Sequence, residues 1–126
     1  MKTVYADIPA YVTKDGSIIR ELMHPAVHGS RNQSLAEAEV PVGAVTLLHV
    51  HHETEELYHV TAGTGRMTLG EGSYEVGVGD TVLIAPGTAH CIANAGSVPL
   101  RILCCCSPAY SHSDTELVVE ADVDPS

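Results

Sequence analysis

The chain has 126 residues, of which 44% are hydrophobic and 17% are charged, a composition that suits one packed domain and excludes an intrinsically disordered chain. Six basic residues stand against sixteen acidic ones, which gives a formal net charge of −10. A nucleic-acid partner requires a basic surface, so we expect no nucleic-acid partner. No apolar run approaches the roughly 20 residues of a membrane-spanning helix, so we expect no membrane partner either.

The N-terminal segment and the cysteines indicate a cellular compartment. The first seven residues lack the apolar stretch of a signal peptide. Three of the four cysteines are consecutive, a spacing unsuited to disulfides among themselves or to a zinc Cys-x-x-Cys motif: Cys104, Cys105 and Cys106. We therefore expect reduced thiols and a cytoplasmic protein.

Short strands are predicted along most of the chain. Residues 4–12 suggest an extended arm, and residues 16–23 a strand that ends at His24-Pro25, because Pro lacks a ladder donor. Residues 35–40 alternate small apolar and acidic side chains, as a half-exposed strand does. Turn residues then separate seven further predicted strands, at residues 45–51, 56–61, 66–69, 73–76, 81–85, 90–93 and 100–106.

This pattern is typical of an all-β sandwich or barrel such as a jelly roll. We expect a single domain over residues 1–126, with an N-terminal arm and strand at 1–33, a barrel core at 34–106 and an acidic tail at 107–126. Five of the sixteen acidic residues lie after Tyr110. We interpret this tail as a solvated, solubilising segment.

Histidines in two predicted strands suggest a metal site. His49 and His51 stand two residues apart, so on a strand both point to one side. If the next strand pairs back through the turn at residues 52–55, Glu56 faces these two imidazoles. His90 follows a Pro-Gly turn and has to come from a neighbouring strand. The four residues together predict one site for a transition metal.

Two alternatives concern the same segment. His51, Glu55 and His59 have the spacing of ligands on a helix, but flanking Pro and Gly residues and the β-branched composition favour a strand. Glu55 also stands next to Glu56, and a change of one residue in the turn would exchange them as ligand. His52 and His59 are interpreted as surface residues or as supports for the ligands.

Two motifs resemble those of the cupin superfamily. The first, Gly-x5-His-x-His-x4-Glu-x6-Gly, is matched by Gly43, His49, His51, Glu56 and Gly63. The second, Gly-x5-Pro-x-Gly-x2-His-x3-Asn, is matched by Gly79, Gly87, His90 and Asn94. The chain departs from the second motif at its Pro position, which is Ala85 with Pro86 beside it, and this leaves the turn chemistry available.

The resemblance implies a double-stranded β-helix barrel with one metal ion at its centre. It covers roughly residues 43–94. Similar small cupins are commonly homodimers, so a homodimer is also implied.

The predicted ligand set suggests chemistry at the ion. Three imidazoles and one carboxylate leave two octahedral positions open for water, O2 or a substrate. Mixed nitrogen and oxygen ligation suits one divalent ion per chain, Fe, Mn, Ni, Co, Cu or Zn, without selecting among them. We interpret the chain first as a metal-dependent oxygenase acting on a small chelating organic molecule. An O2-independent isomerase, cyclase or lyase, and a non-catalytic module that binds metal or a small ligand, are the alternatives.

Catalytic roles are predicted for two side chains. Glu56 or Tyr58 would handle a proton, although Tyr58 fits equally well as a residue that fills the barrel. Cys104 and Cys106 share a predicted strand face with Ile102, and free Cys behaves as a small hydrophobe, so core packing is favoured for both.

Overall fold

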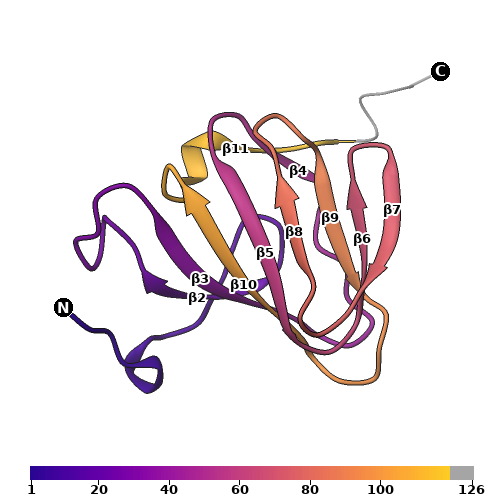
Figure 1. The fold of residues 1–126 in the computed structure, drawn as a ribbon, viewed down its shortest axis with the longest axis horizontal. Coiled ribbons are helices and arrows are strands. Elements are labelled where there is room, and N and C mark those ends of the chain that lie inside the picture. The colour runs from indigo at the N-terminus through magenta and orange to yellow at the C-terminus, as the bar shows by residue number, and fades with distance from the viewer. Residues whose placement is uncertain (120–126) are drawn as a thin grey trace.

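The computed structural model describes residues 1–119 (Figure 1). Within them the elements are, in chain order, η1 (Tyr5–Asp7), β1 (Tyr11–Val12), β2 (Ile18–Met23), β3 (Ser34–Val40), β4 (His49–His51), β5 (Glu55–Ala62), β6 (Gly65–Leu69), β7 (Gly72–Val76), β8 (Thr81–Ile84), β9 (His90–Asn94), β10 (Leu100–Ser107), η2 (His112–Asp114) and β11 (Thr115–Leu117). The described residues contain no helix long and apolar enough to cross a membrane.

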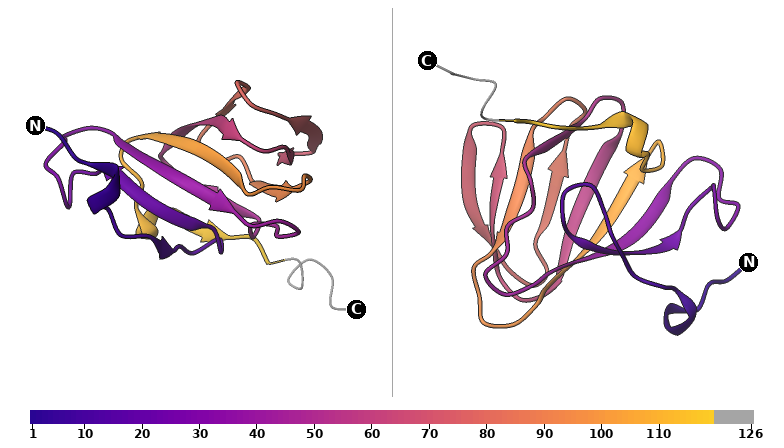
Figure 2. Two further views of the ribbon diagram at one scale, coloured as in Figure 1. Left: turned by 90° about the horizontal axis from the view of Figure 1, so that it is seen from below. Right: turned by 180° about the vertical axis from the view of Figure 1, so that it is seen from behind.

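The strands form two sheets, and Figure 2 shows them from two further sides. One sheet has six strands in the order β1-β2-β3-β10-β5-β8, and the other has five in the order β11-β4-β9-β6-β7. Every strand pair is antiparallel. The predicted all-β jelly-roll, or double-stranded β-helix, barrel is confirmed.

Alternation along the strands forms the core between the two sheets. In β3 and β10 every second side chain is buried, as a sheet with one covered face requires. The most deeply buried apolar side chains come from both sheets: Val40, Val60, Met67, Ile84, Ile92, Leu100 and Ile102. Aliphatic side chains and Met67 thus fill the space that Phe and Trp fill in other barrels.

Strand β4 is shorter than the predicted strand over residues 45–51. Val45 forms only an isolated bridge to Ala93, and Val45 and Leu47 are exposed. The backbone N–H of Leu47 donates to the carbonyl of Asp15 at 2.7 Å, a partner outside the sheet. This segment therefore leaves the ladder before β4 begins.

The expected pairing of the two strands around the turn at residues 52–55 is wrong. Strand β4 pairs with β9 and β11, whereas β5 pairs with β10 and β8. The turn carries the chain from one sheet to the other, so β4 and β5 lie in different sheets. The helix considered for residues 51–59 is also absent from the described structure, where β5 occupies most of that segment.

The interpretation of residues 107–126 as a solvated tail is wrong for its first part. Strand β11 pairs with β4, and Thr115 is buried. The carboxylate of Asp114 accepts hydrogen bonds from the backbone N–H groups of Glu53 and Thr54 at 2.9 and 3.1 Å. The strand pairing and these hydrogen bonds hold the segment against the barrel despite its acidic composition. Three of its acids, Glu120, Asp122 and Asp124, lie outside the described residues.

Two glycines with the same positive φ provide a test of how closely the backbone packs at one end of β5. Gly63 and Gly87 both have φ of +82°, but a Cβ at Gly63 would lie 2.9 Å from the carbonyl oxygen of Pro99, while one at Gly87 would meet nothing within 4 Å. We expect Gly87→Ala to lower the free energy of unfolding by about 1–2 kcal/mol, the cost of a left-handed Ala.

Gly63→Ala adds a clash with fixed backbone and should lower the free energy of unfolding by a further 1–3 kcal/mol or so. Urea denaturation of the metal-free proteins measures both variants. Equal losses for the two would contradict the close approach at Gly63.

Candidate metal centre

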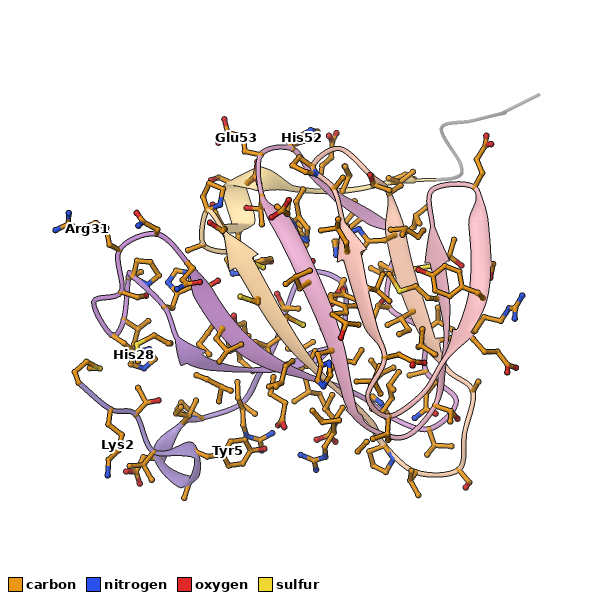
Figure 3. All side chains as sticks on the ribbon, in the orientation of Figure 1. Lys2, Tyr5, His28, Arg31, His52 and Glu53 are labelled. Atoms are coloured by element: carbon orange, nitrogen blue, oxygen red, sulfur yellow. The ribbon has the colours of Figure 1, made fainter. Side chains whose placement is uncertain are left out.

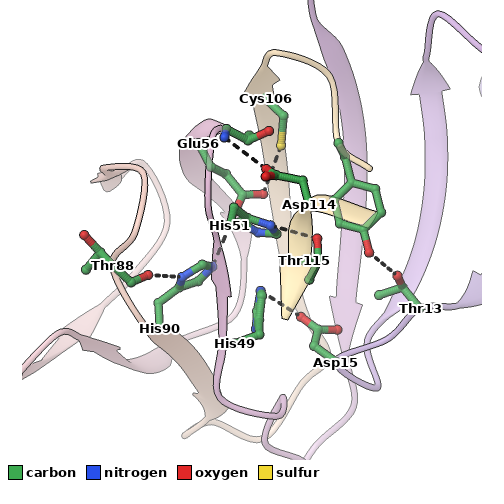
Figure 4. A network of polar contacts seen from close by, with 12 residues as sticks. Thr13, Asp15, His49, His51, Glu56, Thr88, His90, Cys106, Asp114 and Thr115 are labelled. Atoms are coloured by element: carbon green, nitrogen blue, oxygen red, sulfur yellow. Dashed lines mark hydrogen bonds and ion pairs between the residues drawn. The ribbon is translucent and has the colours of Figure 1, made fainter. Parts of the chain in front are cut away.

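Three imidazoles converge inside the barrel (Figure 4). His49 and His51 lie on the inner face of β4, and His90, at the start of β9, pairs directly with His49. All three are buried, with 3%, 3% and 0% of their surfaces exposed. Their ring centroids lie 4.2 to 5.2 Å apart. The predicted convergence of these residues from two separate segments is confirmed.

Hydrogen bonds determine which ring nitrogen carries the proton. Nδ1 of His49 lies 2.8 Å from the carbonyl of Leu47, and Nδ1 of His90 lies 3.0 Å from that of Thr88. A carbonyl only accepts, so Nδ1 carries the proton in both rings. Their Nε2 atoms are left with free lone pairs, the form in which imidazole binds metals.

A threonine fixes the same tautomer in His51, with the proton on Nδ1. Its Nδ1 lies 2.9 Å from Oγ1 of Thr115. That hydroxyl donates its own hydrogen to the carbonyl of Ser111 at 2.8 Å, so it accepts from His51. Burial and then the neighbouring His90 lower the pKa of His49, which keeps that ring neutral at neutral pH.

Glu56 approaches the imidazoles from the opposite sheet. Its Oε1 lies 3.2 Å from Nε2 of His51 and 3.5 Å from Nε2 of His90. Glu56 is buried and Glu55 is exposed, so Glu56 is the carboxylate that faces the imidazoles. Burial by itself raises the pKa of Glu56, but the neighbouring His51 and His90 outweigh it and lower the pKa to about 2, so the carboxyl group is ionised at neutral pH.

This cluster brings lone pairs together without a donor between them. Oε1 of Glu56 and Nε2 of His90 are both buried and have no hydrogen-bond partner. Two acceptors about 3.5 Å apart repel unless a cation lies between them. One ring nitrogen from each of the three histidines lies within 4.8 Å of the other two, so this group can hold a metal ion, and the donor set fits one.

Two residues that the sequence did not indicate contact the ligand cluster. Asp15, on the turn before β2, places Oδ2 at 3.7 Å from Nε2 of His49. The thiol of Cys106 donates to Oε2 of Glu56 at 3.3 Å (Figure 4). Local spacing carries no signal for either, because Asp15 lies outside the predicted strands and the predicted role of Cys106 was core packing.

A cavity opens beside the imidazoles. Its wall joins the inner faces of β2 and β3 to His49 and His51, so a molecule that binds in it lies beside the imidazoles. Tyr58 lines it, with its ring centroid 5.9 Å from that of His90. Burial and then the charge of Glu56 raise the pKa of the Tyr58 hydroxyl well above its usual value, so this hydroxyl stays protonated. Cys104 and Cys106 also line the cavity, while Cys105 lies on the other face, as strand alternation predicts.

Two histidines beside the ligand residues in sequence lie away from the cluster. His52 projects from the β4–β5 turn together with Glu53 (Figure 3), and its Nε2 lies 2.8 Å from Oε1 of Glu116. His59 faces away from the cavity and contacts Thr81. Both are surface residues, one of the two roles expected for them.

Comparisons with known proteins agree with the fold and show the family. Residues 36–106 match the family profile described as a cupin domain. Over 118 residues the chain is 56% identical to the uncharacterized protein MJ1618 of Methanocaldococcus jannaschii, and the alignment covers 94% of each chain. The polyketide cyclase RemF of Streptomyces resistomycificus superposes with a TM-score of 0.80 at 24% identity, covering 94% of this chain and 86% of that one.

A predicted oxalate decarboxylase of Thermotoga maritima superposes with a TM-score of 0.76 at 19% identity, covering 86% of this chain and 99% of that one. At these identities the two solved structures support the fold alone.

Metal addition tests the cluster. We expect a divalent ion such as Zn(II) or Mn(II) to raise the Tm of the metal-free protein, because an ion that binds only the folded state adds about 2.7 kcal/mol of stability at 100 times its Kd. His51→Ala and His90→Ala should each abolish this shift and the bound metal measured by elemental analysis. His59→Ala, on β5 and facing away from the cavity, serves as the control. Full metal content in the His51 and His90 variants would contradict the assignment.

Proposed function

Because this chain belongs to the cupin domain family, we propose that it is a metal-dependent enzyme that acts on a small organic molecule, with an oxygenase reaction as the first candidate. Convergence of three Nε2 lone pairs and one carboxylate at the cavity wall is the observation that supports this proposal. His49, His51, His90 and Glu56 would hold the ion. When bound there, a divalent ion supplies a Lewis acid with open positions, and a redox-active ion also supplies electrons for reaction with O2.

The surrounding residues orient the side chains that would hold the ion and limit the access of water. Carbonyl and hydroxyl acceptors fix the three ring orientations, so no reorganisation is needed when a ligand binds. Cys106 holds one oxygen of Glu56 and leaves the other directed at the imidazoles. The protonated hydroxyl of Tyr58 can donate a hydrogen bond to a substrate oxygen or return a proton to it. Buried apolar side chains on the inner face restrict water: Ile19, Ala36 and Ala38.

Lewis-acid chemistry without O2 is the second candidate, and Asp15 favours it. Its carboxylate lies beside His49 but outside the group of three imidazoles that can share an ion. A carboxylate that stays off the metal can accept a proton from a carbon or hydroxyl next to a metal-bound carbonyl. Isomerisation, cyclisation and elimination all begin with this step.

Oxygen dependence separates the two reactions. We expect protein loaded with Fe(II) or Mn(II) to consume O2 with an enolisable or phenolic chelator drawn from β-diketones and catechols, as measured with an oxygen electrode and by mass spectrometry of products. His51→Ala and His90→Ala should lower the rate at least 100-fold, and His59→Ala should leave it unchanged.

Equal turnover of the same compounds without O2 would replace the oxygenase with the second candidate. A metal-dependent Tm without turnover of any compound in either gas would instead support a binding module.

We further propose that the chain forms a homodimer through the outer face of the six-stranded sheet. Leu35, Cys105, Leu57 and Leu83 pair across β3, β10, β5 and β8 and form one apolar row. Its three leucines are 36%, 40% and 56% exposed. Contiguous apolar rows on a sheet face favour protein contacts, and a two-fold axis would let two copies cover each other.

A single charge in this row tests the homodimer. We expect Leu57→Arg to convert the dimer to a monomer in size-exclusion chromatography with light scattering, because a buried interface cannot accommodate unpaired guanidinium groups. Val78→Arg, at a residue 67% exposed outside the row, is the matched control and should remain dimeric. A wild-type protein that is monomeric at micromolar concentration would contradict the homodimer.

A further inference from the structure

The cavity beside the candidate metal centre is acidic and has no basic side chain in its wall. Its lining includes the carboxylates of Asp15, Glu21 and Glu56, and none of the described residues that line it is Lys or Arg. Three carboxylates against one divalent ion leave one negative charge in excess. An anionic substrate would therefore meet repulsion everywhere except at the ion itself.

The nearest basic side chains are held elsewhere. The ammonium group of Lys14 donates to the backbone carbonyls of His112 and Thr115 at 3.0 and 2.8 Å. Arg20 adjoins Glu21 in sequence, but strand alternation places it on the outer face, 3.8 Å from Glu37. Neither neutralises the carboxylates inside the cavity.

Glu21 has an unused acceptor in this cavity. Its Oε1 accepts a hydrogen bond from the hydroxyl of Tyr11 at 2.8 Å. Its Oε2 is shielded from solvent and has no hydrogen-bond partner. The opposite residue on β3 is Ala36, so a small side chain leaves space beside the carboxylate. A buried carboxylate oxygen without a donor favours a ligand that brings one.

Asp15 is held rigidly on the metal side of the same cavity. Its Oδ1 accepts from both the backbone N–H and the hydroxyl of Ser17, at 2.9 and 2.6 Å. Its Oδ2 is left near Nε2 of His49. The cavity thus has a carboxylate beside the proposed ion and another, Glu21, with one free oxygen.

We propose that this cavity selects a substrate that carries a protonated amine apart from its metal-binding group, and that Glu21 is the residue that determines this specificity. Oε2 of Glu21 accepts the N–H of the amine, and Asp15 adds to the negative charge that attracts it. This inference rests on the proposed function, since the other end of the substrate binds the ion.

Three catechols with the same chelating ring test the inference. Dopamine carries a protonated amine, 4-methylcatechol is neutral and 3,4-dihydroxyphenylacetate carries a carboxylate. Binding of each to Zn(II)-loaded protein is measured by anaerobic calorimetry, so that no redox turnover interferes. We expect dopamine to bind about 10-fold more tightly than 4-methylcatechol, the effect of one charge-assisted hydrogen bond, and the carboxylate to bind most weakly.

Two variants distinguish the effect of Glu21 on dopamine affinity from the effect of the protein's overall negative charge. Glu21→Gln should remove most of the preference for dopamine over 4-methylcatechol while leaving the Zn(II) content and the affinity for 4-methylcatechol unchanged. Glu75→Gln removes an exposed acid from β7 and should change none of these affinities. The melting temperature of each loaded variant checks that it is folded.

Equal affinities for the three catechols, preference for the carboxylate or no catechol binding to Zn(II)-loaded protein would overturn the inference. An undiminished dopamine preference in Glu21→Gln would also overturn the assignment of Glu21. Failure of the wild-type protein to bind Zn(II) at all would overturn the proposed function, and the inference with it.

Discussion

The interior of this barrel depends on one electrostatic constraint: lone pairs from two facing sheets point at each other with no hydrogen between them. His51 and His90 present Nε2 atoms toward Oε1 of Glu56 at 3.2 and 3.5 Å. Carbonyl and hydroxyl partners at Nδ1 prevent the rings from turning their protons inward. A bound cation, or a proton shared between ring and carboxylate, relieves the repulsion. Of these, a divalent ion satisfies all the donors at once.

The two sheets make this constraint geometrically possible. Side chains on β4 and β9 supply the imidazoles from the five-stranded sheet, and β5 supplies Glu56 from the six-stranded sheet. A ligand set divided between sheets responds to their separation, and the packing of residues such as Met67 and Ile102 maintains that separation. Bound metal would cross-link the two layers, so metal binding and barrel stability are coupled.

Period-two alternation and motif spacing were sufficient to predict the three histidines, because each lies on a strand whose inner face the alternation identifies. The choice between Glu55 and Glu56 depended on the turn at residues 52–55. That turn was predicted to form a hairpin, but it connects the two sheets. The role of Thr115 as the hydrogen-bond partner of His51 could not be predicted, for a different reason. Its acidic neighbours suggested solvent exposure, and only the pairing of β11 with β4 places its hydroxyl beside His51. Residues that act across 60 or more positions leave no local pattern.

The residues of the candidate ion site and the other residues that line the cavity come from different parts of the chain. All four residues of the candidate ion site lie within residues 36–106, the part that matches the cupin family. Asp15, Glu21, Tyr110 and Thr115 line the same cavity from outside that part. The flanks are joined to each other by Lys14, which binds two carbonyls of the C-terminal segment, and by the contact of Thr13 with Tyr110. The flanks can therefore change without altering the residues that would hold the ion, and the proposed selectivity for an amine belongs to a carboxylate of the N-terminal flank, Glu21.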